Sequence, residues 1–173
     1  MDNKVTSPLI KGAFLGVLFI AYSLIIQLAV DSKTAQRFQV IQFLIIIGGV
    51  IWACVSFAKQ MNGAVTFGSV FSHGFKVTAI LTIISILFTI VSLKFLFPEM
   101  MEKAIDAAKE EMMKNSSNKK MSEEQVDKNL SMMRNYFFPF AIMGVMLLNI
   151  FLGAIASLIG AAVAKKNPNN FPS

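Results

Sequence analysis

The chain has 173 residues, of which 55% are hydrophobic and only 15% are charged, and its formal net charge is +6. Soluble domains usually carry about 25% charged residues, and so small a globule cannot hide this much apolar surface from water. An ordinary soluble domain is therefore excluded, and the lipid bilayer is the expected partner. No basic run is interleaved with aromatic residues, so the positive charge does not indicate nucleic-acid binding.

Four apolar stretches are each long enough for a membrane-spanning helix, which needs about 20 residues. Because the backbone must satisfy its own hydrogen bonds in lipid, the sequence predicts an all-α, multi-pass protein with a single membrane domain over residues 1–173. The first stretch is longer than a signal-peptide core and lacks a cleavage site, so it is interpreted as retained. Pro139 is placed in the first turn of the fourth span. The spans are expected at about 12–30, 40–57, 77–97 and 136–164.

An even number of spans predicts that both termini lie on the same side of the membrane. Lysines flank the spans on that side, whereas the long loop between the third and fourth spans mixes basic and acidic residues. Since span-proximal positive charges in short segments favour the cytoplasm, we expect cytoplasmic termini and an external long loop. The lysines on the terminal side are Lys4, Lys11, Lys59, Lys76, Lys165 and Lys166.

Residues 60–76 are predicted to form an interfacial segment between the second and third spans. Thr66 can cap a short helix, and the aromatic residues that follow it share one helical face. Such a segment would anchor the third span at the membrane surface. The functional alternative is a lipid sensor or docking element.

Residues 98–135 are predicted to form an extracytoplasmic, antiparallel helical hairpin. Pro98 opens a first helix, "NSSNKK" interrupts it, and Ser122 with Gln125 forms a capping box for a second. Two apolar stripes of matching length indicate arms that pack on each other, and the alternative is a solvated, disordered loop. The stripes are Met101, Ile105, Ala108 and Met112 in one arm and Val126, Leu130, Met133 and Phe137 in the other.

The stretch "QMNGAVTFGSVFSHGFKVTAIL", with "FPEMMEKAIDAAKEEMMK", "MSEEQVDKNLSMM" and "SLIGAAVAKKNP", resembles the domain-of-unknown-function family 4199. The resemblance covers roughly the whole chain and implies a small four-span inner-membrane protein of Gram-negative bacteria, with no established activity. Ser69 stands where such proteins often have an acid. The matching residues are Gly63, Thr66, Phe67, Gly68, Phe71, Gly74 and Phe75.

Five hydroxyl residues of the third span step by four, three, four and three, so they share one helical face. Hydroxyls in lipid bond back to their own helix or across to a neighbour, which indicates helix packing. The alternative is a polar transport track, although no acidic residue accompanies it. Lys94 lies near the end of the same span and is expected to snorkel to the headgroups. The hydroxyl residues are Thr78, Thr82, Ser85, Thr89 and Ser92.

The fourth span combines one amide with small residues at helical spacing. Asn149 needs a polar partner, expected from the hydroxyl face or from Gln27. Gly153, Ser157, Gly160 and Ala161 predict close helix contact, for which Gly12 and Gly16 offer a matching face on the first span.

Few residues in this chain suggest chemistry. The only histidine, His73, has no acid or cysteine nearby in sequence, and Cys54 lies in an apolar run where a packed thiol is expected. No nucleophile, P-loop or metal motif is present in the sequence, so we expect neither a cofactor nor an enzyme.

The favoured hypothesis is a non-enzymatic interaction or scaffold protein of the bacterial inner membrane. Its hairpin at residues 98–135 would bind a membrane protein or a second copy of the chain, because methionine-rich surfaces adapt to varied partners. The alternative is a small transporter or channel-like oligomer lined by the hydroxyl face of the third span.

Overall fold

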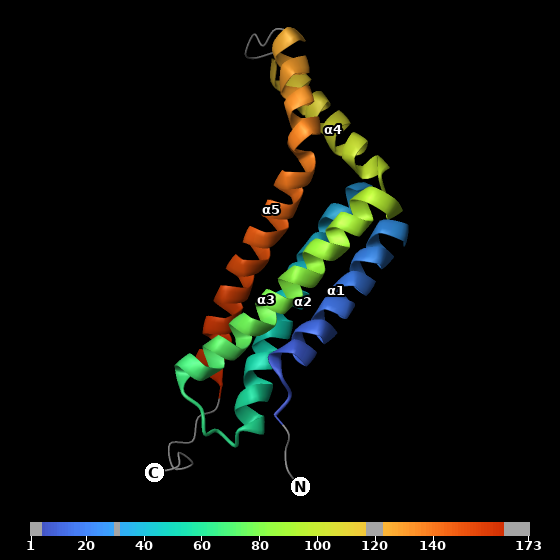
Figure 1. The fold of residues 1–173 in the computed structure, drawn as a ribbon. Helices are drawn as coiled ribbons and strands as arrows, with labels where there is room; N and C mark the ends of the chain where they lie inside the picture. The colour runs from blue at the N-terminus through green and yellow to red at the C-terminus, as the bar shows by residue number, and fades with distance from the viewer. Residues whose placement is uncertain (1–4, 30–31, 117–122, 165–173) are drawn as a thin grey trace. The chain divides into compact units, whose positions relative to one another are not determined.

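In the computed structural model, which describes residues 5–29, 32–116 and 123–164, every regular element is helical (Figure 1). The predicted all-α class is therefore confirmed. The elements are α1 (Pro8–Ala29), α2 (Ser32–Gln60), α3 (Phe67–Val91), the π-helical turn η1 (Ser92–Leu96), α4 (Glu99–Ser116) and α5 (Glu123–Val163).

Four helical segments are long and apolar enough to cross a membrane, as the sequence predicts. They cover Pro8–Ala29, Val40–Gln60, Phe67–Leu96 and Glu124–Val163. Large apolar side chains such as Leu28, Phe95 and Phe151 stay exposed on these helices. Because water would not tolerate so much exposed apolar surface, the four helices fit a multi-pass membrane protein.

The chain divides into two compact units, and the division falls inside α3 and α5. Residues 1–85 and 145–173 form the first unit, here called the membrane unit, and residues 86–144 form the second, here called the arm unit. In the membrane unit the start of α1, the end of α2, the start of α3 and the end of α5 lie at one end (Figure 1). We call this end the lysine end, because Lys11, Lys59 and Lys76 lie there.

The core of the membrane unit is built around α3, which contacts the other three helices. Gly12 of α1 approaches Ile80, while Gly74 of α3 approaches Cys54 of α2 and Ser157 of α5. Small residues permit these close approaches, since no side chain holds the backbones apart. The side chains at the centre are fully buried, among them Val50, Val77, Leu81 and Ala156.

The turn between α2 and α3 uses two helix-capping motifs. Gly63 N–H donates to Ala58 O (2.9 Å) and Asn62 N–H donates to Lys59 O (3.0 Å). Asn62 has φ 51° and Gly63 has φ 78°, so α2 ends in a left-handed C-cap of the Schellman type. At the start of α3, Ser69 N–H donates to Thr66 Oγ1 (3.1 Å) and Thr66 N–H donates to Ser69 Oγ (3.0 Å). Serine thus fills the capping-box position usually held by Glu or Gln.

The segment 60–76 differs from the separate interfacial helix that the sequence suggests. Its helical part, from Phe67 onward, is continuous with the third span as α3. No proline interrupts this run, and Gly74 is held between Cys54 and Ser157 instead of breaking the helix. Local packing therefore extends the third helix by about three turns beyond the expected start at Val77.

The prediction for Pro139 is wrong. The proline lies inside α5, sixteen residues after its first residue, rather than in a first turn. Its missing N–H leaves the Asn135 carbonyl without its usual helical donor. The helix continues through it because the preceding arm residues are themselves helical from Glu123, so no helix start is needed near Tyr136.

In the arm unit, α4 contacts the first part of α5 through a small apolar cluster. Ile105, Val126 and Leu130 are buried there, with Met101 and Met112 packed against them. Arg134 donates to Glu102 at 2.7 Å alongside this cluster. Ser122, the expected N-cap of the second arm, lies outside the described residues.

Candidate functional site

The hydroxyl face of α3 hydrogen-bonds within its own helix. Thr78 Oγ1 donates to Gly74 O (3.1 Å), Thr82 Oγ1 to Thr78 O (2.9 Å) and Ser85 Oγ to Leu81 O (2.9 Å). These three side chains and Ser92 are buried, whereas Thr89 is half-buried. These three hydroxyl protons bond to backbone carbonyls of the same helix, an arrangement that fits helix packing.

Small residues of α5 lie against α2 and α3. A methyl group added at Gly153 would collide with Thr78, and one added at Gly160 would come within 2.6 Å of Cys54 Cβ. Ser157 and Ala161 have no exposed surface. In α1, Gly12 and Gly16 contact Ile80 and Ile84 of α3, so this small-residue face is used within one chain.

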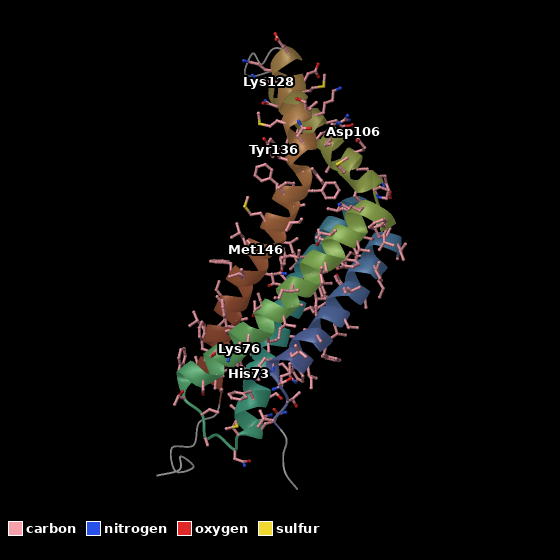
Figure 2. The ribbon with its side chains drawn as sticks, in the orientation of Figure 1. His73, Lys76, Asp106, Lys128, Tyr136 and Met146 are labelled. Carbon is pink, nitrogen blue, oxygen red and sulfur yellow. The ribbon has the colours of Figure 1, made fainter. Side chains whose placement is uncertain are left out.

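His73 is buried near the lysine end, where sequence reasoning did not place it (Figure 2). Cys54 is buried in the core of the same unit. The imidazole stacks on Phe57, with ring centroids 4.2 Å apart and planes 11° apart, and its Nε2 has no hydrogen-bond partner among the described residues. Cys54 Sγ lies 3.7 Å from Val70 O. Among the described residues no group of three His, Cys, Asp or Glu side chains could hold a metal ion.

Asn149 is buried in α5, but its amide nitrogen finds no acceptor among the described residues. The expected partners do not supply one: Gln27 donates to Ser23 O of its own helix (3.2 Å), and Thr82 bonds back to Thr78 O. The polar partner that the sequence predicts for this amide nitrogen is therefore not found among the described residues.

Lys94 lies on the exposed side of η1, in the arm unit. Its Nζ is 5.7 Å from the centroid of the Phe138 ring. At this distance an ammonium is attracted to the ring face while staying accessible to lipid headgroups or water.

The residues that carry the family resemblance serve mainly as turn, cap and packing positions. Gly63 takes the positive φ of the α2 C-cap, and Thr66 caps α3. Gly68 has open space around its Cα, whereas Gly74 is buried. Phe67 and Phe75 are exposed, and Phe71 stacks on Phe75 with centroids 6.0 Å apart.

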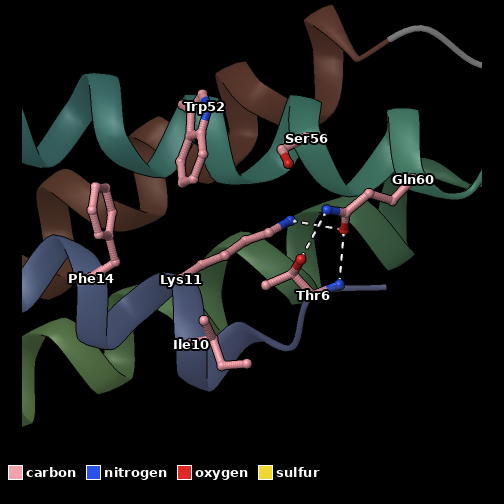
Figure 3. A pocket seen from close by; sticks show the side chains of 7 residues that line it. All are labelled: Thr6, Ile10, Lys11, Phe14, Trp52, Ser56 and Gln60. Carbon is pink, nitrogen blue, oxygen red and sulfur yellow. Dashed lines mark hydrogen bonds between the residues drawn. The ribbon is translucent and has the colours of Figure 1, made fainter. Parts of the chain in front are cut away.

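A groove at the lysine end contains the most unusual side chain of the membrane unit. Lys11 is only 2% exposed, and its Nζ donates to Ala53 O (3.3 Å) and Gln60 Oε1 (3.4 Å). Gln60 also accepts from Thr6 N–H and donates to Thr6 Oγ1, both at 3.0 Å (Figure 3). The groove encloses about 260 Å³ and is lined by Thr6, Ile10, Lys11, Phe14, Trp52, Ser56 and Gln60.

Sequence reasoning missed this groove because it assigned Lys11 to the flank of the first span. The structure begins α1 at Pro8, so Lys11 belongs to the first turn of the helix. One signal was available in the sequence. Lys11 directly precedes Gly12, which belongs to the predicted packing face, so the lysine could also be buried against a neighbouring helix.

A family described as "Protein of unknown function (DUF4199)" matches residues 11–166 of the chain. The match covers most of the sequence and confirms the resemblance. No curated protein and no solved structure matches.

Proposed function

The chain belongs to the DUF4199 family of proteins of unknown function, and from that premise we propose that it is a non-enzymatic, membrane-anchored interaction protein. Its membrane unit anchors it, and residues 98–135, acting as an antiparallel helical hairpin, bind a membrane protein or a second copy of the chain. One observation carries the proposal: the arm unit has its own apolar cluster and still leaves methionines exposed.

The apolar cluster supports a hairpin with a stable shape. Ile105 of α4 is buried against Val126 and Leu130 of α5, and the 2.7 Å pair between Glu102 and Arg134 joins the same two arms. Most of the stability of a helix in a protein comes from packing of its apolar face, so this pairing stabilises the amphipathic α4. A stable shape reduces the entropy lost on binding a partner.

The methionines of the arm unit divide into two groups. Met101 and Met112 pack against the cluster, whereas Met100, Met113 and Met132 are exposed by 40%, 57% and 51%. The thioether is flexible and polarizable, and it fits irregular apolar surfaces. These three exposed methionines are therefore the positions of the arms that we assign to partner contact.

We place the protein in the bacterial inner membrane with both termini in the cytoplasm. Support comes from the exposed Lys59 and Lys76 at the lysine end of the membrane unit, since positive charges close to spans favour the cytoplasmic side. The arms would then project on the opposite side.

Photo-crosslinking in native membranes tests the proposed role. A photoreactive amino acid is placed at Met113 or Met132 of the full chain, with Asp106 and Lys128 as exposed control positions. We expect strong, discrete adducts from the methionine positions and weak, diffuse ones from the controls. An adduct of twice the chain mass identifies a second copy, and any other mass identifies a different protein. Equal yields from both sets would overturn the proposal.

A further inference from the structure

Lys11 brings a positive charge into the membrane unit, and no described acidic side chain accompanies it. Residues 5–29, 32–85 and 145–164 contain neither Asp nor Glu, and the two acids of this unit, Asp2 and Asp31, lie outside the described residues. A buried ammonium without a counter-charge is costly, and buried charges are usually paired. The carbonyl and amide oxygens that it contacts offer only partial charges.

A purely structural role in capping α2 does not explain Lys11. Ala53 lies seven residues before the end of α2 at Gln60, so its carbonyl already accepts a helical bond. The carbonyls that lack helical donors are the last four of the helix. Lys11 thus adds a bond where none is missing, and one of its three N–H donors has no described protein acceptor.

The groove around Lys11 changes from polar to apolar along its length. Thr6 and Gln60 lie at one end, and Phe14 and Trp52 lie at the other, with ring centroids 6.1 Å apart (Figure 3). Phe14 is 54% exposed and Trp52 is 50% exposed. The polar end coincides with the helix termini, whereas the aromatic end faces the middle of the two spans. This is the polarity profile of a membrane lipid near its headgroup.

We propose that this groove binds the headgroup region of an anionic bilayer phospholipid. The phosphate accepts hydrogen bonds from the remaining Lys11 N–H and from the hydroxyl of Thr6, whose oxygen already accepts from Gln60. The first methylenes of an acyl chain lie along Phe14 and Trp52. A volume of about 260 Å³ holds a headgroup and a short length of chain, so the rest of the lipid stays in the bilayer.

Lipid retention measured by native mass spectrometry tests this site. The full chain is reconstituted in equal parts of phosphatidylglycerol and phosphatidylcholine, then released with its bound lipids. We expect the wild type to retain phosphatidylglycerol in preference to phosphatidylcholine. In Lys11→Met the ratio of the two retained lipids should fall about tenfold, because a hydrogen bond to a charged group is removed. Lys59→Met, an exposed lysine at the same end, serves as the matched control and should retain the selectivity.

One further variant and one competition experiment complete the test. Ser56→Phe fills the groove while leaving every hydrogen bond of Lys11 in place, so it should also lose the lipid even if Lys11→Met folds poorly. Excess inorganic phosphate should fail to displace phosphatidylglycerol. Displacement by phosphate would overturn the lipid assignment in favour of a free-anion site. A wild type without lipid selectivity, or a Ser56→Phe variant that keeps it, would overturn the site itself.

Discussion

Single residues decide how closely the helices of the membrane unit approach. Gly153 of α5 lies against the β-branched side chain of Thr78, which is buried and holds its hydroxyl on Gly74 O. By contrast, Gly144 of the same helix has no atom near the position of an added methyl group. The two glycines therefore have different roles, although both stand in an apolar helix.

This difference predicts opposite effects on the free energy of unfolding. Gly153→Ala should destabilise the protein by about 1–3 kcal/mol, because Thr78 cannot turn away without losing its hydrogen bond. Gly144→Ala, the matched control, should be neutral or stabilise by up to about 1 kcal/mol, because alanine favours helix. Unfolding in mixed detergent micelles measures both. Equal effects of the two changes would mean that the α3–α5 contact is not as close as described.

At the level of elements, helices continue past the limits that hydropathy suggests. α3 starts at Phe67 and α5 starts at Glu123. The third and fourth apolar spans are therefore each continuous with the helical segment that precedes them in the chain. α3 gives way to the π-helical turn η1, closed by a bond from Phe97 N–H to Ser92 O (2.8 Å). The chain then enters α4 after only two residues, Phe97 and Pro98.

Engineered disulfides test the pairing of α4 with the first part of α5. Cysteines replacing Met112 and Val126, in a Cys54→Ser background, should oxidise within one chain. Cysteines replacing Met101 and Val126 should not, because eleven helical residues separate 101 from 112, about 16 Å along the axis, and a disulfide needs Cα atoms within about 7 Å. Gel mobility without reductant measures the outcome. Efficient 101–126 oxidation would show that the arms are a flexible loop.

At the scale of the whole molecule, two units of different character share one chain. The membrane unit has a core of small and apolar residues, and its described residues include no acid. The arm unit carries the described acidic residues and an amphipathic α4. This contrast between an apolar anchor and charged arms underlies the proposed interaction role.

The orientation of the whole chain is tested with compartment-specific reporters. A reporter active only in the periplasm should function when inserted at Asn118, which lies outside the described residues, and should be inactive when fused after Ser173. A reporter active only in the cytoplasm should give the reverse pattern. The physical reason is the cluster of lysines beside the spans at the lysine end. Periplasmic activity after Ser173 would reverse the orientation that we propose.

The sequence by itself determined the all-α class and the four apolar spans. Both follow from composition along the chain, since lipid demands helices of about 20 apolar residues whatever their neighbours are. The shared face of Thr78, Thr82 and Ser85 follows from helical spacing in the same way.

Only the tertiary structure decided which residues around those spans enter the core. The sequence predicts that Lys11 flanks the first span, but the packing of α1 on α2 buries it beside Gln60 and forms the groove. Pro139 lies within α5 because the arm residues before it are already helical. The buried amide nitrogen of Asn149 finds no acceptor among the described residues, which its position in an apolar helix did not reveal. Burial of a side chain depends on the neighbouring helix, and that neighbour comes from a distant part of the chain.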